Sequence, residues 1–156
     1  MTASALFDLA SASFIARFAA AMAARKSAVY AVLTYDGDQR WTPEHEADAH
    51  LLEAFHAHQR RDKGLGPAAG PDASDALSEA FTALGYAVQE GDSAWRLGPE
   101  SGVGDEALIA ALAAGFAQAA RETGLVDATA LAAWSAVTRT HAVVGHADTL
   151  ALPRAP

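Results

Sequence analysis

The sequence predicts an α/β fold, in which a small mixed sheet of about three strands carries helices packed against it. Three observations support this. The run from Ala28 to Tyr35 is largely apolar, which is typical of a strand covered on both faces in a parallel sheet. Apolar residues recur at helical spacing on both sides of that run. The chain then closes with further strand-like segments, which predict a final pair of strands.

The first half of the chain predicts a helix, a strand and a helical insertion. Ser11 is a suitable N-cap for a helix over about 12–25, because its hydroxyl can accept a backbone N–H of the first turn. Strand 28–35 follows, and the segment 36–38 (Asp-Gly-Asp) predicts a turn. Thr42-Pro43-Glu44 predicts the start of a helix that reaches about residue 63, and the glycine- and proline-rich residues that follow predict a loop over 64–71.

The second half predicts helices that alternate with short strands. Gly85 ends a helix that begins near residue 74. The remaining predicted elements are strand pieces at 86–90 and 94–97, helices at about 105–122 and 127–138, and a final strand at 142–152. No composition change suggests a linker between domains. We therefore expect 1–156 to form a single, partial α/β domain with a helical insertion over about 42–71.

The sequence does not show which segment pairs with the strand 28–35. No segment before residue 28 is predicted to pair with it, and proteins avoid exposed, flat, apolar strand edges. We expect either an N-terminal segment outside this chain or a second copy of the chain to cover that edge. A second copy would pair around a twofold axis and give a homodimer with one continuous sheet.

Composition excludes several classes of function. The chain has 156 residues, of which 51% are hydrophobic and 19% charged, and its net charge is −8. That charge argues against broad binding to nucleic acid or to an anionic membrane surface. The sequence contains no cysteine, so thiolate metal sites, cysteine nucleophiles and disulfides are excluded. No stretch predicts a membrane span or a signal peptide, and we expect a cytoplasmic protein.

The histidines do not predict a metal site. His45 and His50 are five residues apart, whereas a helical zinc motif places two histidines four apart on one face. His56 and His58 are two apart and also diverge around a helix. A metal-dependent hydrolase is therefore disfavoured, and no triad or nucleophile elbow accompanies the serines.

Several segments together resemble one known family. They are Thr2–Leu9, Ala28–Tyr35, the loop sequence Arg60–Pro71, and the last two strand segments Ser93–Leu97 and Val144–Pro153. In this order they resemble the C-terminal half of a class I S-adenosylmethionine-dependent methyltransferase. They correspond to the residues after its fourth strand, its fifth strand, its lid insertion and its antiparallel final strands. The family's glycine-rich cofactor loop has no counterpart in this sequence.

The resemblance implies roles for particular residues. Asp8 falls beside the transferring methyl group and could accept a proton, although an acid in a first helical turn is an equal alternative. The lid region implies substrate binding by Arg60, Arg61, Asp62, Lys63 and Gly66, with Trp95 as a further candidate. The cations could instead decorate a helix C-terminus, and a strand tryptophan is more often a core residue.

Two functions follow from these observations. The first is the substrate and lid portion of an S-adenosylmethionine-dependent methyltransferase, inactive by itself because the cofactor loop is absent. The alternative is a non-catalytic, dimeric interaction module. The sequence does not identify the methyl acceptor.

Overall fold

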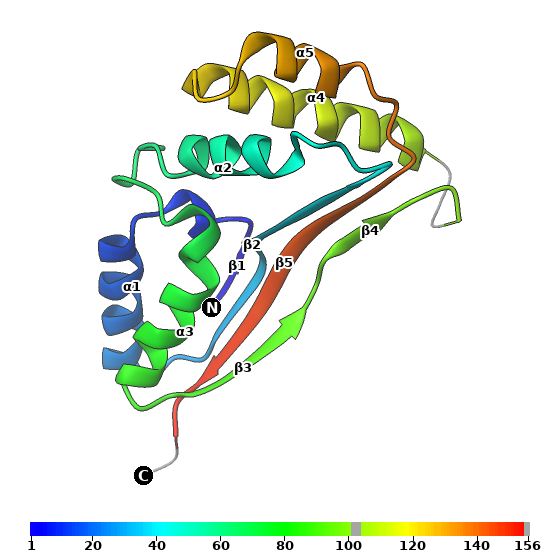
Figure 1. Ribbon diagram of the computed structural model, residues 1–156. Helices are drawn as coiled ribbons and strands as arrows, with labels where there is room; N and C mark the ends of the chain where they lie inside the picture. Colours follow the sequence, from blue (N-terminus) through cyan, green and yellow to red (C-terminus); the bar gives the residue numbers. More distant parts are fainter. Residues whose placement is uncertain (101–103, 155–156) are drawn as a thin grey trace. The chain divides into compact units, whose positions relative to one another are not determined.

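The computed structural model describes residues 1–100 and 104–154 and has an α/β architecture with a mixed sheet (Figure 1). The sheet has five strands in place of the three or so predicted. They are β1 (Thr2–Ser4), β2 (Val29–Thr42), β3 (Ala87–Asp92), β4 (Trp95–Leu97) and β5 (His141–Leu152). Their order is β1-β2-β5-β3, and β4 also pairs with β5. The last strand of the chain therefore lies between β2 and β3.

The helices are α1 (Ala12–Ala24), α2 (Asp48–Gln59), α3 (Ala73–Ala83), α4 (Asp105–Thr123) and α5 (Ala128–Ser135), with short 3₁₀ turns η1 (Phe7–Leu9) and η2 (Gly70–Asp72). Helices α1, α3 and α4 begin and end within about one residue of the predicted positions, α5 ends earlier than predicted, and α2 is shorter than the predicted helix 42–63 at both ends. Ser11 is the predicted N-cap of α1, and its hydroxyl accepts the Phe14 N–H at 3.2 Å. Gly85 follows α3 with a φ of 82°, a left-handed conformation that glycine adopts without strain.

The prediction that nothing before residue 28 could pair with the buried strand is wrong. β1 pairs with β2 in parallel, with Thr2 opposite Tyr30 and Ser4 opposite Val32. A strand of three residues is too short to show an alternating pattern in the sequence. Its pairing depends on the neighbouring strand, so only the tertiary structure reveals it. β1 thus pairs with part of the edge that suggested a dimer, at residues Tyr30 to Val32.

Two local predictions around the end of this strand are also wrong. Residues 36–38 do not form a turn but lie inside β2, which continues to Thr42. The helix does not begin at Thr42-Pro43-Glu44 but at Asp48, whose carboxylate accepts the His45 N–H at 2.8 Å. Thr42 is held in the strand because its carbonyl accepts the Thr140 N–H at 2.7 Å. Pairing between distant segments therefore outweighs the local helix-start signal.

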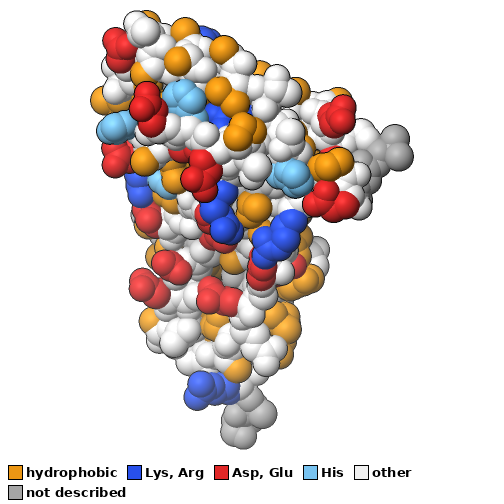
Figure 2. All heavy atoms as spheres, turned by 45° about the vertical axis from the view of Figure 1, so that its right-hand side comes forward, with side chains coloured by type: hydrophobic (Ala, Val, Ile, Leu, Met, Phe, Trp, Pro, Cys, Tyr) orange, Lys and Arg blue, Asp and Glu red, His pale blue; other side chains and the backbone are white. Residues whose placement is uncertain are grey.

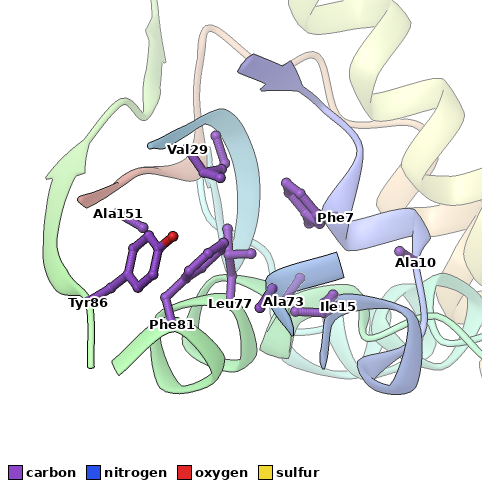
Figure 3. Close-up of a cluster of buried hydrophobic side chains, with 11 residues drawn as sticks. Phe7, Ala10, Ile15, Val29, Ala73, Leu77, Phe81, Tyr86 and Ala151 are labelled. Carbon is purple, nitrogen blue, oxygen red and sulfur yellow. The ribbon is translucent and has the colours of Figure 1, made fainter. Parts of the chain in front are cut away.

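The chain divides into two compact units, which we describe separately. The first comprises Met1–Asp38, Gln59–Ala94 and the residues from Gly145 onward. Its core lies between the sheet and helices α1 and α3 (Figure 3). Phe7, Ile15, Leu77 and Phe81 are all about 1% exposed or less. Burial of such side chains contributes about 1.5–3 kcal/mol each, so this cluster holds the helices on the sheet.

The second unit comprises Gln39–His58 and Trp95–Val144. Its core is built around aromatic rings from the end of β2, from α4 and from α5. The Trp41 ring centroid lies 5.5 Å from that of Phe116 and 5.6 Å from that of Trp134. Trp41 is 4% exposed, so it is a core residue of this unit.

The face shown in Figure 2 has no broad positive surface, as the net negative charge of the sequence predicts. On the face shown in Figure 2, Lys and Arg side chains are interspersed with Asp and Glu side chains. In the described ranges, no helix is long and apolar enough to cross a bilayer.

Gly145 of β5 packs so closely against β2 that any side chain should destabilise the protein. A Cβ atom there would collide with the Asp36 carboxylate and would lie 2.8 Å from Asp38 Cβ. Because the Asp38 Cβ is fixed to its backbone, we expect Gly145→Ala to lower the free energy of unfolding by about 1–3 kcal/mol, measured by urea denaturation. Gly115→Ala is the matched control, since no atom lies within 4 Å of the added methyl. It should raise stability by up to about 1 kcal/mol, and equal effects of the two variants would contradict this account.

Candidate functional site

The candidate site lies in the first unit, where β1 ends. In open α/β sheets, ligands bind beyond the carboxyl ends of the parallel strands. β1 ends at Ser4 and leads into η1, which carries Asp8. Ala5 and Leu33 both have positive φ, 49° and 56°. They are neighbours across the two strands, because the Ala5 N–H donates to the Val32 carbonyl at 3.0 Å. Strained non-glycine residues of this kind gather at functional sites.

Asp8 is the acid that this geometry positions at the strand end. Its side chain is partly buried, and among the described residues its Oδ1 has no hydrogen-bond partner. Burial raises the pKa of Asp8, while a hydrogen bond from its own backbone N–H and the charge of His146 oppose that rise. Asp8 is therefore a carboxyl group with a buried oxygen that lacks a donor among the described residues, and with a raised proton affinity.

The side chains of His146 and Tyr35 lie next to one another in the first unit. Their ring centroids are 6.4 Å apart, and the rings meet edge to face at 72°. Tyr35 is 5% exposed. Burial raises the pKa of Tyr35, and the nearby charges of Asp36 and Asp38 raise it further. Tyr35 therefore stays a neutral phenol.

Asp148 fixes the path of β2 beside these rings. Its Oδ1 accepts the Leu33 N–H at 3.0 Å, and its Oδ2 accepts the Tyr30 hydroxyl at 2.9 Å. Burial raises the pKa of Asp148, but the nearby Ser93 side chain and the hydrogen bonds from the Leu33 N–H and the Tyr30 hydroxyl outweigh that effect and lower the pKa overall. We refer to Asp8, Tyr35, His146 and Asp148 together as the strand-end site.

The predicted substrate-binding loop is shaped by its own residues. Asp62 Oδ1 accepts the N–H groups of Gly64 and Gly66, at 2.7 and 3.1 Å. Arg60 and Asp72 form an ion pair of 2.9 Å. Three of the predicted residues (Arg60, Asp62 and Gly66) thus hold the loop together. The other two, Arg61 and Lys63, are exposed.

The structure brings this loop beside the segment that carries Asp8. The Ser11 N–H donates to the Leu65 carbonyl at 3.3 Å, and the Ala69 N–H donates to the Ala10 carbonyl at 2.7 Å. Gly66 lies so near that a Cβ atom there would be 3.2 Å from Ser11 Cβ. Asp8 and the loop were predicted from separate parts of the sequence. They lie in adjoining segments of the same unit.

Trp95 is not the core residue that the sequence offered as one alternative. It belongs to the second unit, where β4 pairs it with Val144 of β5. It is 38% exposed, and its role as a ligand contact stays a prediction.

Sequence reasoning missed three of the four residues of the strand-end site. The sequence places Tyr35 only within a buried strand, and no local pattern singles out His146 or Asp148 in the last strand segment. The one available signal was the spacing of His146 and Asp148, because alternate residues of a strand share a face. Their proximity to β2 comes from pairing across more than one hundred residues of sequence, which no local pattern encodes.

The second unit contains a groove of about 870 Å³. One wall is a face of α4 rich in alanine, and the other is the segment from Trp134 to Thr140. Arg139 is buried there, with its guanidinium carbon 4.6 Å from the centre of the Trp134 ring and its Nη2 3.6 Å from Asp48 Oδ1. Burial lowers the pKa of Arg139, and Asp48 opposes the shift. The groove contains none of the residues predicted to bind substrate.

The described histidines are not arranged to hold a metal ion. His58 Nε2 lies 3.0 Å from the Glu122 carboxylate, as in an ordinary polar pair. Over residues 1–100 and 104–154, no group of three or more His, Asp or Glu side chains is suitably placed for a metal.

No protein-family model matches the sequence, and no curated protein matches it. The functional argument therefore depends on the strand-end site itself.

The two aspartates of the site should affect stability in opposite directions. Because the pKa of Asp8 is raised in the folded protein, its ionisation at neutral pH opposes folding, and this cost disappears below the unfolded value of about 3.9. Asp8→Asn should therefore raise the free energy of unfolding near pH 7 but not near pH 3, as measured by urea denaturation.

Asp148 gives the matched comparison. Its pKa is lowered in the folded protein, so its contribution to stability is present above about pH 3.9 and is lost as pH falls through the folded value. Asp148→Asn should lower the free energy of unfolding near pH 7 by about 1 kcal/mol, because hydrogen bonds to an ionised acceptor are weakened. If the two variants shift stability in the same direction at pH 7, the assigned environments are wrong.

Proposed function

We propose that this chain is the acceptor-binding portion of an S-adenosylmethionine-dependent methyltransferase, with Asp8 as the group that accepts the proton of the methyl acceptor. The observation that carries the proposal is the position of Asp8. It is a partly buried carboxyl group with an unpartnered oxygen among the described residues, directly beyond the end of a parallel strand. General bases have this combination of burial and raised pKa.

The topology of the sheet supports the same proposal. The resemblance implies that the segment around Asp8 follows one strand, that the next strand lies parallel to it, and that an antiparallel pair closes the sheet. Here β1 and β2 are parallel, and β3 and β5 are antiparallel with Val88 opposite Ala151. Fold alone does not establish an activity, so the topology adds to the argument from Asp8 and does not replace it.

The residues present do not fit the whole cofactor. The family binds S-adenosylmethionine through a glycine-rich loop between a parallel strand and a helix. The sequence after β1 (Ala5–Leu9) contains no glycine, and none follows β2 before Gly64. We therefore assign no cofactor-binding residue, and we propose that this chain is inactive by itself.

The loop after α2 would contribute to acceptor binding in this proposal. Arg60, Asp62 and Gly66 shape the loop, while Arg61 and Lys63 present positive charge at its surface. Guanidinium and ammonium groups attract carboxylate or phosphate groups. Trp95 belongs to the second unit, and its role in binding stays a prediction from the sequence.

The proposal can be tested on the native protein. We would isolate it from its own cells with an antibody against this chain and irradiate it with methyl-tritiated S-adenosylmethionine. We expect tritium to cross-link to the polypeptide that contains this sequence and to be transferred to a small molecule of the cell extract. Chromosomal Asp8→Asn should keep the cross-link and reduce transfer by about 10²- to 10⁴-fold.

A matched control is Asp75→Asn, an exposed acid in the first turn of α3. It should leave both signals unchanged. Absence of the cross-link in the native protein, or normal transfer with Asp8→Asn, would refute the proposed function.

The dimeric interaction module remains the alternative proposal. β1 pairs with Tyr30, Ala31 and Val32 of β2, and it is the last of the described strands at this end of the sheet. A second copy of the chain could pair with β1 or with the part of β2 beyond Val32, so the alternative predicts a dimer through this edge. Light scattering at micromolar concentration measures this directly, and a stable dimer would favour the alternative. The cytoplasmic location stays a prediction.

A further inference from the structure

We infer that the groove of the second unit binds a second copy of this chain, and that the α4 helices of the two copies pack antiparallel around a twofold axis. The contact lies in a different unit from the strand-end site, and it does not depend on the proposed methyl transfer. It also differs from a dimer through β1, which belongs to the first unit.

The groove is lined by side chains that allow a close approach. The wall formed by α4 consists of Glu106, Ala110, Ala113, Ala114, Ala117, Gln118 and Arg121. The opposite wall includes the small side chains of Ser135, Ala136 and Thr138. Alanine on a helix face lets a second helix approach to the short end of the usual range of about 8–10 Å between helix axes. The groove therefore suits a helix whose own contact face is equally small.

The α4 wall is a continuous face of one helix. Because an α-helix turns by about 100° per residue, Glu106, the four alanines and Arg121 all fall within about 100° of its circumference. They extend for about 22 Å along the helix axis, given the rise per residue. The face thus consists of an alanine stretch with an acid near one end and a base near the other.

This face is complementary to itself when a second copy runs in the opposite direction. With the twofold axis between residues 113 and 114, the facing pairs are Glu106 with Arg121, Ala110 with Ala117, and Ala113 with Ala114. Ala110 and Ala114 are exposed, whereas Ala113 is half-buried and Ala117 is 4% exposed. Each alanine pair therefore sets a protruding methyl group against a recessed one. A contact around a twofold axis requires such a self-complementary surface, which is why we assign the groove to a second copy.

The charges determine the direction of the second helix. Glu106 and Arg121 are both exposed, and among the described residues Arg121 donates to the side-chain oxygen of Gln118 at 2.7 Å. The antiparallel arrangement places a Glu–Arg pair at each end of the contact. A parallel arrangement would place Glu beside Glu and Arg beside Arg, which is unfavourable. Exposed ion pairs add little affinity, so the alanine contact provides the binding and the charges provide its direction.

The first experiment uses the absence of cysteine from the sequence, which makes any introduced cysteine unique. Residue 114 lies beside the twofold axis, so its two copies come within the Cα separation of about 7 Å that a disulfide tolerates. We expect Ala114→Cys to form a covalent dimer under mild oxidation, seen on a non-reducing gel. Gly115→Cys is the matched control, because it lies outside the groove lining and its added Cβ meets no atom within 4 Å. Equal cross-linking of the two variants, or none in either, would overturn the inference.

The second experiment reverses the charges at the ends of the contact. Glu106→Arg alone, or Arg121→Glu alone, places like charges together at both ends and should raise the dimer dissociation constant at least about tenfold. The double variant restores opposite charges and should return the constant to within about threefold of the original, as measured by sedimentation equilibrium. Glu79→Arg, an exposed reversal on α3, is the control and should have little effect. Both α4 positions are exposed, and circular dichroism checks that each variant folds.

The remaining outcomes also decide the question. A dimer seen by light scattering alone would not distinguish this contact from one through the β1 edge. A dimer that is indifferent to the charge reversals would lie on another surface and overturn the inference. A chain that stays monomeric at every concentration would also overturn it and leave the groove to a different occupant. None of these results changes the cross-link to S-adenosylmethionine that the proposed function predicts, so the two proposals fail separately.

Discussion

The first unit depends on the close pairing of β2 with β5, and Asp148 is the residue that fixes it. Its carboxylate accepts the Leu33 N–H and the Tyr30 hydroxyl. A few residues further along, Gly145 lies against Asp36 and Asp38. From Leu33 to Asp38 along β2, the contacting residues of β5 go back from Asp148 to Gly145. The two strands are therefore antiparallel. Leu33, whose N–H binds Asp148, has a φ of 56° within β2.

The strand-end site combines stabilising and destabilising groups in one small region. Asp148 is an acid held in its ionised form by donors, whereas Asp8 is an acid partly withdrawn from water without a donor for Oδ1. Natural proteins keep such unfavourable features where function needs them. The backbone strain at Ala5 and Leu33 is likewise unfavourable for folding. The unit tolerates these costs because its core of large apolar side chains is fully buried.

The sequence predicted the helices well because their signals are local. The Ser11 cap, the apolar spacing along α1 and α4, and Gly85 after α3 all act within one or two turns. Predictions failed where a distant strand competed with a local signal. Thr42-Pro43-Glu44 has the residues of a helix start, yet Thr42 pairs with Thr140 and stays in β2. For the site, Asp8 and the loop at 60–66 were predicted through the resemblance, while Tyr35 and Asp148 were not.

The sequence by itself determined the α/β class, the positions of most helices and the buried character of the strand from Ala28 to Tyr35. It also determined that the chain has no cysteine and carries excess negative charge. The tertiary structure decided that β1 pairs with the start of β2, that β5 lies between β2 and β3, and that the segment carrying Asp8 lies beside the loop after α2. The physical reason is that periodicity and capping depend on residues within a few positions of one another. Strand pairing and the burial of a carboxyl group depend on residues brought together from both ends of the chain.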